Sequence, residues 1–170
     1  MKFKLLRYSL LALLFFLNNP VLAEDPRYQI ELMVFSQTLP NTEVFEQTIS
    51  QIAWPSDLTE LSAYKIADAT ALADSYAAMA KDPVYRPMLH ISWIQAGQGA
   101  PVHIQSGDGK LNGYVQLQQG SGLQLRVDLE FAANQGELIY HLTEKRSVKL
   151  NEDYYLDHPL FGLVATIKLL

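Results

Sequence analysis

The sequence predicts an α+β domain: a largely antiparallel β-sheet of about five to six strands with one main helix packed on one face. Three observations lead to this prediction. The second half of the chain alternates apolar and polar residues over several segments, which is the period of a half-buried strand. Short glycine-containing turns separate some of these segments, and an Ala-rich stretch with helical spacing precedes them. One helix placed before a run of strands can cover one face of their sheet.

The first 23 residues have the pattern of a secretory signal peptide. A cationic start, MKFKLLR, is followed by the apolar run YSLLALLFFL and by NNPVLA, which places small or apolar residues at Val21 and Ala23. This run is shorter than the roughly 20 apolar residues of a transmembrane helix. We therefore expect cleavage after Ala23, export, and no stable membrane anchor; an uncleaved inner-membrane anchor is the alternative. Residues 24–170 then form a single domain of ordinary size.

The exported part is acidic and contains no cysteine. Loss of Lys2, Lys4 and Arg7 with the leader leaves ten Lys plus Arg against 18 Asp plus Glu, a net charge of −8. Such a domain is a poor binder of nucleic acid or polyphosphate, whereas glycans, proteins and cationic partners suit it better. The absence of Cys excludes disulfides and a lipid-modified cysteine, so stability must come from an ordinary core.

The first half of the domain is expected to contribute one strand and the main helix. YQIELMVF (28–35) is apolar on both parities, which indicates a central strand covered on both faces. Residues 36–58 have two prolines and no sustained period, so we predict an irregular connection with one short helix around 43–51. The main helix is expected within 56–83, where apolar residues recur at helical spacing and Pro83 ends the element.

The second half is expected to be strands. In MLHISWIQ (88–95), Trp93 shares its parity with Leu89 and Ile91, which favours core packing over stacking on a ligand. Segments 111–119 and 122–131 are joined at Gly120–Gly122 as a hairpin, and the second segment alternates most clearly. A long strand at 138–150 and a final strand at 159–170 complete an antiparallel sheet of consecutive hairpins.

Asp157 and His158 form an acid–imidazole pair in the sequence, which raises the question of general acid–base catalysis. Adjacent residues of an extended segment point to opposite faces, however, so these side chains are not expected to meet. The favoured interpretation is structural: Asp157 accepts hydrogen bonds from nearby amides, Pro159 fixes an extended path into the last strand, and Gly162 permits a close backbone approach.

Other kinds of catalytic and metal sites find little support. The histidines, His90, His103, His141 and His158, have no paired ligand spacing, and a structural zinc site without Cys is improbable, so no metal or cofactor is predicted. There is no GxSxG elbow and no Cys. Paired carboxylates for glycoside cleavage stay open, because any two acids can meet in space, but no pair stands out.

Several blocks of the sequence, taken in order, resemble a known family. They are RYQIELMVF after the leader, WPSDL, VYRPMLHISWIQ (84–95) and KRSVKLNEDYYLDHPLFGLVATIKL (145–169). In this order they are similar to the CsiV family of periplasmic peptidoglycan-binding proteins of Gram-negative bacteria. YLDHPLFG is the most specific string, and together the blocks cover roughly half of residues 24–170. The resemblance implies a non-enzymatic periplasmic protein that binds the wall polymer and promotes synthesis by a bifunctional penicillin-binding protein through its outer-membrane lipoprotein activator.

A recognition surface is therefore the predicted kind of site, with no catalytic residue. Sugars are held by aromatic faces together with side chains that hydrogen-bond hydroxyls and amides, and basic residues can pair with stem-peptide carboxylates. The candidate ligand-binding residues lie in or beside the two longest blocks: Tyr85, Arg86, His90, Lys145, Arg146, Tyr154, Tyr155 and His158. The open alternatives are a surface or backbone-bonded role for His90 and a merely solvated basic face at Lys145 and Arg146. At the level of the whole protein they are an envelope adaptor with little glycan affinity and a peptidoglycan hydrolase.

Overall fold

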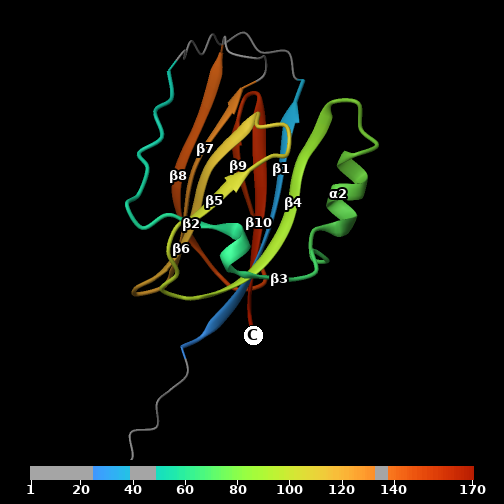
Figure 1. The fold of residues 1–170 in the computed structure, drawn as a ribbon. Coiled ribbons are helices and arrows are strands. Elements are labelled where there is room, and N and C mark those ends of the chain that lie inside the picture. Colours follow the sequence, from blue (N-terminus) through green and yellow to red (C-terminus); the bar gives the residue numbers. More distant parts are fainter. Residues whose placement is uncertain (1–24, 39–48, 133–137) are drawn as a thin grey trace, which may run out of the picture.

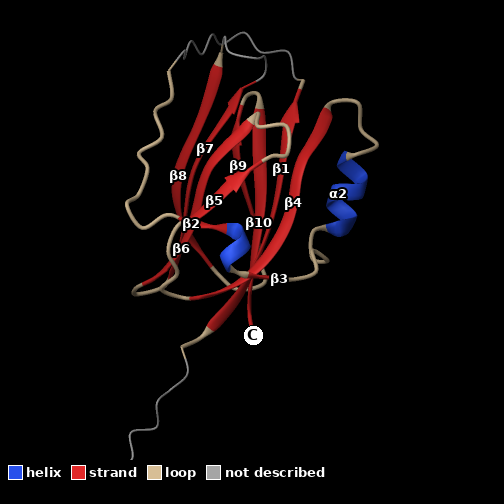
Figure 2. Cartoon of the chain, viewed as in Figure 1, coloured by secondary structure: helices blue, strands red, loops and turns tan. Residues whose placement is uncertain are grey.

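The computed structural model describes residues 25–38, 49–132 and 138–170. In these ranges ten strands form two five-stranded sheets that face each other, and one short helix lies outside them (Figures 1 and 2). We call the sheet ordered β3-β4-β1-β10-β9 sheet A and the sheet ordered β2-β5-β6-β7-β8 sheet B. The predicted signal peptide at 1–23 lies outside the described residues, as does most of the predicted helix around 43–51; residues 49–51 are not helical.

Sheet A is antiparallel throughout and is built around β1 (Arg27–Gln37). Its other strands are β3 (Lys65–Ile66), β4 (Tyr85–Ala96), β9 (Asp153–His158) and β10 (Phe161–Leu169). β1 pairs with β4 on one side and with β10 on the other. Residues 30–35 of β1 are buried on both parities, so the prediction of a central strand covered on both faces is confirmed.

Sheet B contains β2 (Thr59–Glu60), β5 (Val102–Gln105), β6 (Leu111–Gln119), β7 (Leu123–Ala132) and β8 (Ile139–Val148). All of its pairings are antiparallel except the short parallel pair of β2 with β5. The predicted hairpin is confirmed, because Gln119 lies opposite Leu123 and the turn between them is Gly120–Gly122. The strands predicted at 111–119, 122–131 and 138–150 are β6, β7 and β8.

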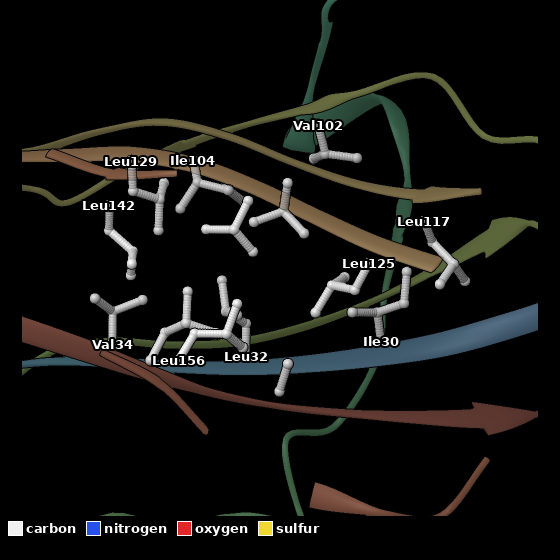
Figure 3. Close-up of a cluster of buried hydrophobic side chains, with 14 of the residues drawn as sticks. Ile30, Leu32, Val34, Val102, Ile104, Leu117, Leu125, Leu129, Leu142 and Leu156 are labelled. Carbon is white, nitrogen blue, oxygen red and sulfur yellow. The ribbon is translucent and has the colours of Figure 1, made fainter. Parts of the chain in front are cut away.

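The core lies between the two sheets and consists of the inward-facing aliphatic residues of both (Figure 3). Ile30, Leu32 and Val34 of β1 face Leu125 and Leu129 of β7 across this layer. Trp93 is fully buried in the same cluster, as its parity predicts. The opposite parity of β1, with Met33 and Phe35, forms the outer face of sheet A; the outer face of sheet B carries Tyr114 and its polar neighbours.

The prediction of one sheet is wrong, because the final strand does not continue the run of hairpins. β10 pairs with β1 and β9 in sheet A, whereas β8 ends sheet B at its edge. Four strands were also missed: the two-residue strands β2 and β3, which lie within the predicted helix, and β5 and β9. β5 has only four residues, and β9 is interrupted by acids, so neither shows a clear alternating pattern.

The main helix is much shorter than predicted. Within 56–83 only α2 (Ala73–Met79) is α-helical; a 3-10 turn (Leu61–Ala63) and the short strands β2 and β3 occupy the first part. Ile66 pairs with Trp93, and the Ala67 amide donates to the carbonyl of Ser92, so this part is held extended along β4. Pairing with the sheet overrides the helical propensity of the Ala-rich sequence. α2 packs beside β4 outside the sandwich (Figure 1).

Candidate functional site

A cleft lies at the end of the sandwich. At this end β1, β5 and β7 finish and β4 begins (Figure 1). We call it the end cleft. It has a volume of about 370 Å³ and takes its lining from both sheets: Ser36, Arg86, Pro87 and Met88 come from sheet A, and Ser106, Gly107, Asp108, Lys110 and Phe131 come from sheet B and its β5–β6 turn. One predicted site residue, Arg86, is therefore part of a concave site.

Arg86 is exposed at the start of β4, and its Nη1 donates to two main-chain carbonyls. The acceptors are the oxygens of Pro83 and Tyr85, both at 3.3 Å. The pair Ser36–Arg86 in the β1–β4 ladder directs this side chain toward the interior end of the sandwich, opposite to its neighbour Tyr85. The two carbonyl groups thus orient the guanidinium, and its other N–H groups remain able to donate to a bound carboxylate.

The turn between β5 and β6 forms the opposite wall and is fixed by one carboxylate. Asp108 Oδ1 accepts from the hydroxyl of Ser106 at 2.6 Å and from the amide of Lys110 at 3.1 Å. These hydrogen bonds, with that of Ser106 the largest, lower the pKa of Asp108. Gly109 has φ of +71°, a conformation that glycine adopts without strain. The wall therefore presents an ionised carboxylate and the exposed ammonium of Lys110 side by side.

An aromatic cluster lies behind the cleft. Phe131 packs against Phe161 at 5.7 Å and against Tyr140 at 6.4 Å between ring centroids. His158 completes the cluster, with its ring centroid 5.5 Å from that of Phe161 and 5.6 Å from that of Tyr140. Burial lowers the pKa of His158, which outweighs the opposing effect of Asp157.

The local geometry agrees with the structural interpretation of the Asp157–His158 pair except in one respect: among the described residues no amide donates to Asp157, whereas the Leu160 amide donates to His158 Nδ1 at 3.3 Å. β9 is extended, so Asp157 is exposed on one face while His158 packs inward on the other. The two-residue turn after β9 is held by Gln37, whose Nε2 donates to the carbonyls of His158 and Pro159 at 3.1 and 3.2 Å. A Cβ on Gly162 would lie 3.0 Å from the Phe35 ring, which confirms the close approach expected there.

Two other predicted residues meet on the outer face of sheet A. Phe35 stacks on Tyr155 with centroids 6.2 Å apart and meets Tyr85 edge-on at 5.4 Å. The ring of Tyr155 is 45% exposed, and burial of its remainder raises its pKa. We call Tyr85, Phe35 and Tyr155 the aromatic row. No local pattern links Phe35 to the two tyrosines, since the three residues lie on β1, β4 and β9.

Three other predicted residues lie on or beside β8 and β9. Arg146 Nη1 donates to the carbonyl of Tyr155 at 2.9 Å and its Nη2 pairs with Glu144 at 2.6 Å, so it joins the edge of sheet B to the edge of sheet A. Tyr154 accepts from the amide of Lys149 at 2.7 Å and donates to Glu152. Lys145 is exposed on the outer face of sheet B, opposite Arg126. These residues do not line the end cleft.

His90 lies beneath α2. Its Nε2 is 2.9 Å from Glu31 Oε1, and its ring stacks on that of Tyr76 with centroids 4.8 Å apart. Glu31 is buried and also accepts from the amides of Ala71 and Leu72 at 2.9 and 2.8 Å. Burial raises the pKa of Glu31, but these hydrogen bonds together outweigh it and the net pKa is lowered.

Sequence reasoning missed Asp108, Lys110 and Phe131. The string SGDGK (106–110) carries a turn signal, with Asp-Gly between two strands, that marks a loop able to present charges. In the part of the chain that the structure describes, no group of three or more His, Asp or Glu residues is placed to hold a metal ion. No helix in these ranges has the length and apolar composition needed to cross a membrane.

Comparison with known proteins identifies the family of the chain. No curated protein and no solved structure matches the chain. A family model described as "Peptidoglycan-binding protein, CsiV" matches residues 53–169, which include the strands from β2 to β10 and all lining residues of the end cleft except Ser36. This match covers more than half of the chain, and so the chain belongs to the CsiV peptidoglycan-binding protein family.

Proposed function

We propose that this chain is a non-catalytic periplasmic protein that binds peptidoglycan, and that the end cleft holds the stem peptide of the polymer. One observation carries the proposal: in a chain of this family, the cleft combines the cations of Arg86 and Lys110 with the carboxylate of Asp108 and an aromatic wall at Phe131. Stem peptides carry free carboxylates, which guanidinium and ammonium groups bind by charge-assisted hydrogen bonds. Those of many walls also carry a free ammonium, which an ionised Asp108 can accept.

The size of the cleft supports a short peptide segment as the ligand. Its volume of about 370 Å³ lies near the lower end of the roughly 300–1,000 Å³ typical of small-molecule sites. One or two residues with their carboxylate fit such a space, whereas a glycan strand of several sugars does not. The Arg86 guanidinium is already oriented by the carbonyls of Pro83 and Tyr85, so little side-chain entropy is lost on binding.

Co-sedimentation of the purified protein with cell-wall sacculi tests this proposal. We expect wild-type protein in the pellet at low salt, and less in the pellet as salt screens the ion pairs. Arg86→Ala removes one charge-assisted contact, which corresponds to a loss of about 10- to 100-fold in affinity. The double variant Arg86→Ala, Lys110→Ala should stay largely in the supernatant.

The matched control carries Arg27→Ala and Lys65→Ala, which remove the same charges at exposed positions outside the cleft. It should sediment like the wild type. If the cleft variant and the control sediment equally well, the cleft is not the binding site. Wild-type protein that stays entirely in the supernatant at low salt contradicts the function itself, and release of soluble muropeptides would identify a hydrolase instead.

The proposal extends to location and partner. A leader at 1–23 supports export to the periplasm, and the family resemblance supports a role in promoting wall synthesis by a bifunctional penicillin-binding protein through its lipoprotein activator. We place the protein contact at the aromatic row, because Tyr155 is exposed there and faces away from the end cleft. A photo-crosslinker at Tyr155 should trap one envelope protein. Capture of that protein by a chain that fails to bind sacculi would favour the adaptor alternative.

A further inference from the structure

A second hollow lies on the outer face of sheet B, on the other side of the β5–β6 turn from the end cleft. Its volume is about 260 Å³, and its lining includes Ser50, Trp54, Asn112 and Glu130. Lys110 and the neighbouring turn border both this hollow and the end cleft. The two sites are therefore adjacent, and one polymer can reach both.

Trp54 is held against the sheet by two rings. Its ring centroid is 5.8 Å from that of His103 in an edge contact and 6.3 Å from that of Tyr114 in a tilted one. The segment that carries it, teal in Figure 1, runs along sheet B to β2 and is also fixed where the Gln51 amide donates to Glu130 Oε1 at 2.6 Å. Trp54 is nevertheless 45% exposed. An indole that is fixed by its neighbours and still open to solvent is a ready surface for stacking.

The polar groups around the indole are also fixed in place. Asn112 Oδ1 is 2.8 Å from His103 Nε2, which leaves the amide NH₂ of Asn112 to donate toward the hollow. His103 is in turn bonded through Nδ1 to Glu60 at 3.0 Å. Glu130 is buried and also lines the hollow; it lies on the same face as Asn112, directly opposite it in the β6–β7 ladder.

An aromatic face beside an amide donor, a carboxylate and the Ser50 hydroxyl is the combination that binds a sugar, because it pairs both the apolar and the polar surfaces of the ring. The volume suits a single ring rather than a chain. We propose that this hollow is a subsite for one N-acetylhexosamine of a β-linked glycan strand, with the sugar stacked on Trp54 and its hydroxyl or acetamido groups bonded to Asn112 and Glu130. This inference rests on the proposed function and assigns the glycan to sheet B while the stem peptide occupies the end cleft.

Titration with an N-acetylglucosamine tetramer, which has no stem peptide, tests the proposal. The chain has two tryptophans, and only Trp54 is exposed, since Trp93 is fully buried. We expect saturable quenching or a shift of tryptophan fluorescence in the wild type. Trp54→Ala should abolish this signal and weaken binding measured by calorimetry by at least about 10-fold.

Asn112→Ala keeps the Trp54 reporter and should weaken tetramer binding by about 10-fold through loss of one hydrogen bond in a partly buried site. Gln118→Ala is the matched control, because Gln118 lies on the same face of β6 beyond the hollow and should leave the titration unchanged. Circular dichroism melts identify a variant that fails to fold. Arg86→Ala should weaken stem-peptide and sacculus binding by about 10- to 100-fold while it binds the tetramer like the wild type.

The outcomes separate this inference from the proposed function. Wild-type protein that sediments with sacculi but gives neither fluorescence change nor heat with the tetramer overturns the glycan subsite and leaves the function intact. Equal tetramer binding by the wild type, Trp54→Ala and Asn112→Ala also overturns it. If Trp54→Ala and Asn112→Ala both weaken tetramer binding but the wild-type protein does not sediment with sacculi, the subsite is supported and the proposed function is contradicted.

Discussion

Glutamine in place of Glu31 is expected to be the most informative stability variant, because this buried carboxylate fixes the segment that covers sheet A. Its two oxygens accept from the amides of Ala71 and Leu72 and bond His90, at 2.8 to 2.9 Å. Glutamine has the same shape but offers one acceptor oxygen and one NH₂ group. In either orientation the NH₂ faces one of these two main-chain N–H groups, that of the exposed Ala71 or that of the buried Leu72, and that donor loses its acceptor.

The magnitude follows from these contacts. The loss of one main-chain donor bond costs about 1–3 kcal/mol, and the remaining hydrogen bonds lose their charge assistance, for a total of about 2–4 kcal/mol. For a domain of this size that loss lowers Tm by about 5–15 °C. Thermal melts followed by circular dichroism at pH 7 measure it. Asp74→Asn, an exposed acid in the first turn of α2, is the control and should change stability by less than about 0.5 kcal/mol.

The pH dependence adds a second readout with a fixed sign. The folded-state pKa of Glu31 is lowered from its ordinary value of 4.5, so the carboxylate stabilises the fold above that pH and the effect is lost as pH falls through the folded value. The gap in Tm between wild type and Glu31→Gln should therefore narrow below pH 4.5. Equal melting of the two proteins at pH 7, or a gap that stays constant into acid, would refute the reasoning.

Three further changes have definite expected results. Gly113→Ala should lower the free energy of unfolding, measured by urea titration, by about 2–5 kcal/mol, because Gly113 has φ of +147° and a Cβ there would collide with the Asp128 carbonyl. The control is Gly120→Ala, because a Cβ at that position meets open space. Burial lowers the pKa of His158, so wild-type stability should fall as pH drops below 6.5, and His158→Gln should flatten that fall between pH 7 and 5. Burial lowers the pKa of His103, but its hydrogen bonds to Asn112 and Glu60 outweigh burial, so the net pKa is raised. The protonated ring therefore stabilises the fold below pH 6.5, and this stabilisation is lost as pH rises through the folded-state pKa. His103→Gln should accordingly destabilise the protein more at pH 5.5 than at pH 8.

Local patterns predicted the strands but not their neighbours. The alternation in 111–119 and 123–131 depends only on each segment having one buried face, and the strands appear where it indicates. Which sheet a strand joins depends on pairings between distant residues, such as Val34 with Leu163, and a period of two carries no information about them. The division into two sheets therefore could not be obtained from the pattern.

The site was predictable only in part, for a related reason. Arg86 was found from its sequence block, but the other charges of the end cleft come from a turn on the opposite sheet. Phe131 lies at the end of the clearly alternating segment 122–131, yet nothing in its own strand indicates that it ends beside a cleft. Trp54 lies in a stretch without regular period, so its contact with Tyr114 across sheet B has no local signature.

The buried acids favour a binding protein over a hydrolase. In the described ranges the acids with little exposure are Glu31, Asp128 and Glu130. Glu31 and Glu130 accept main-chain amides of the segments that cross sheets A and B, and Asp128 bonds His141 at 2.6 Å and the Tyr114 hydroxyl at 3.3 Å. Glycoside hydrolysis needs one carboxyl group that protonates the leaving oxygen and a second that attacks or activates water. Carboxylates that already accept amide, imidazole and phenol hydrogen bonds anchor the fold instead.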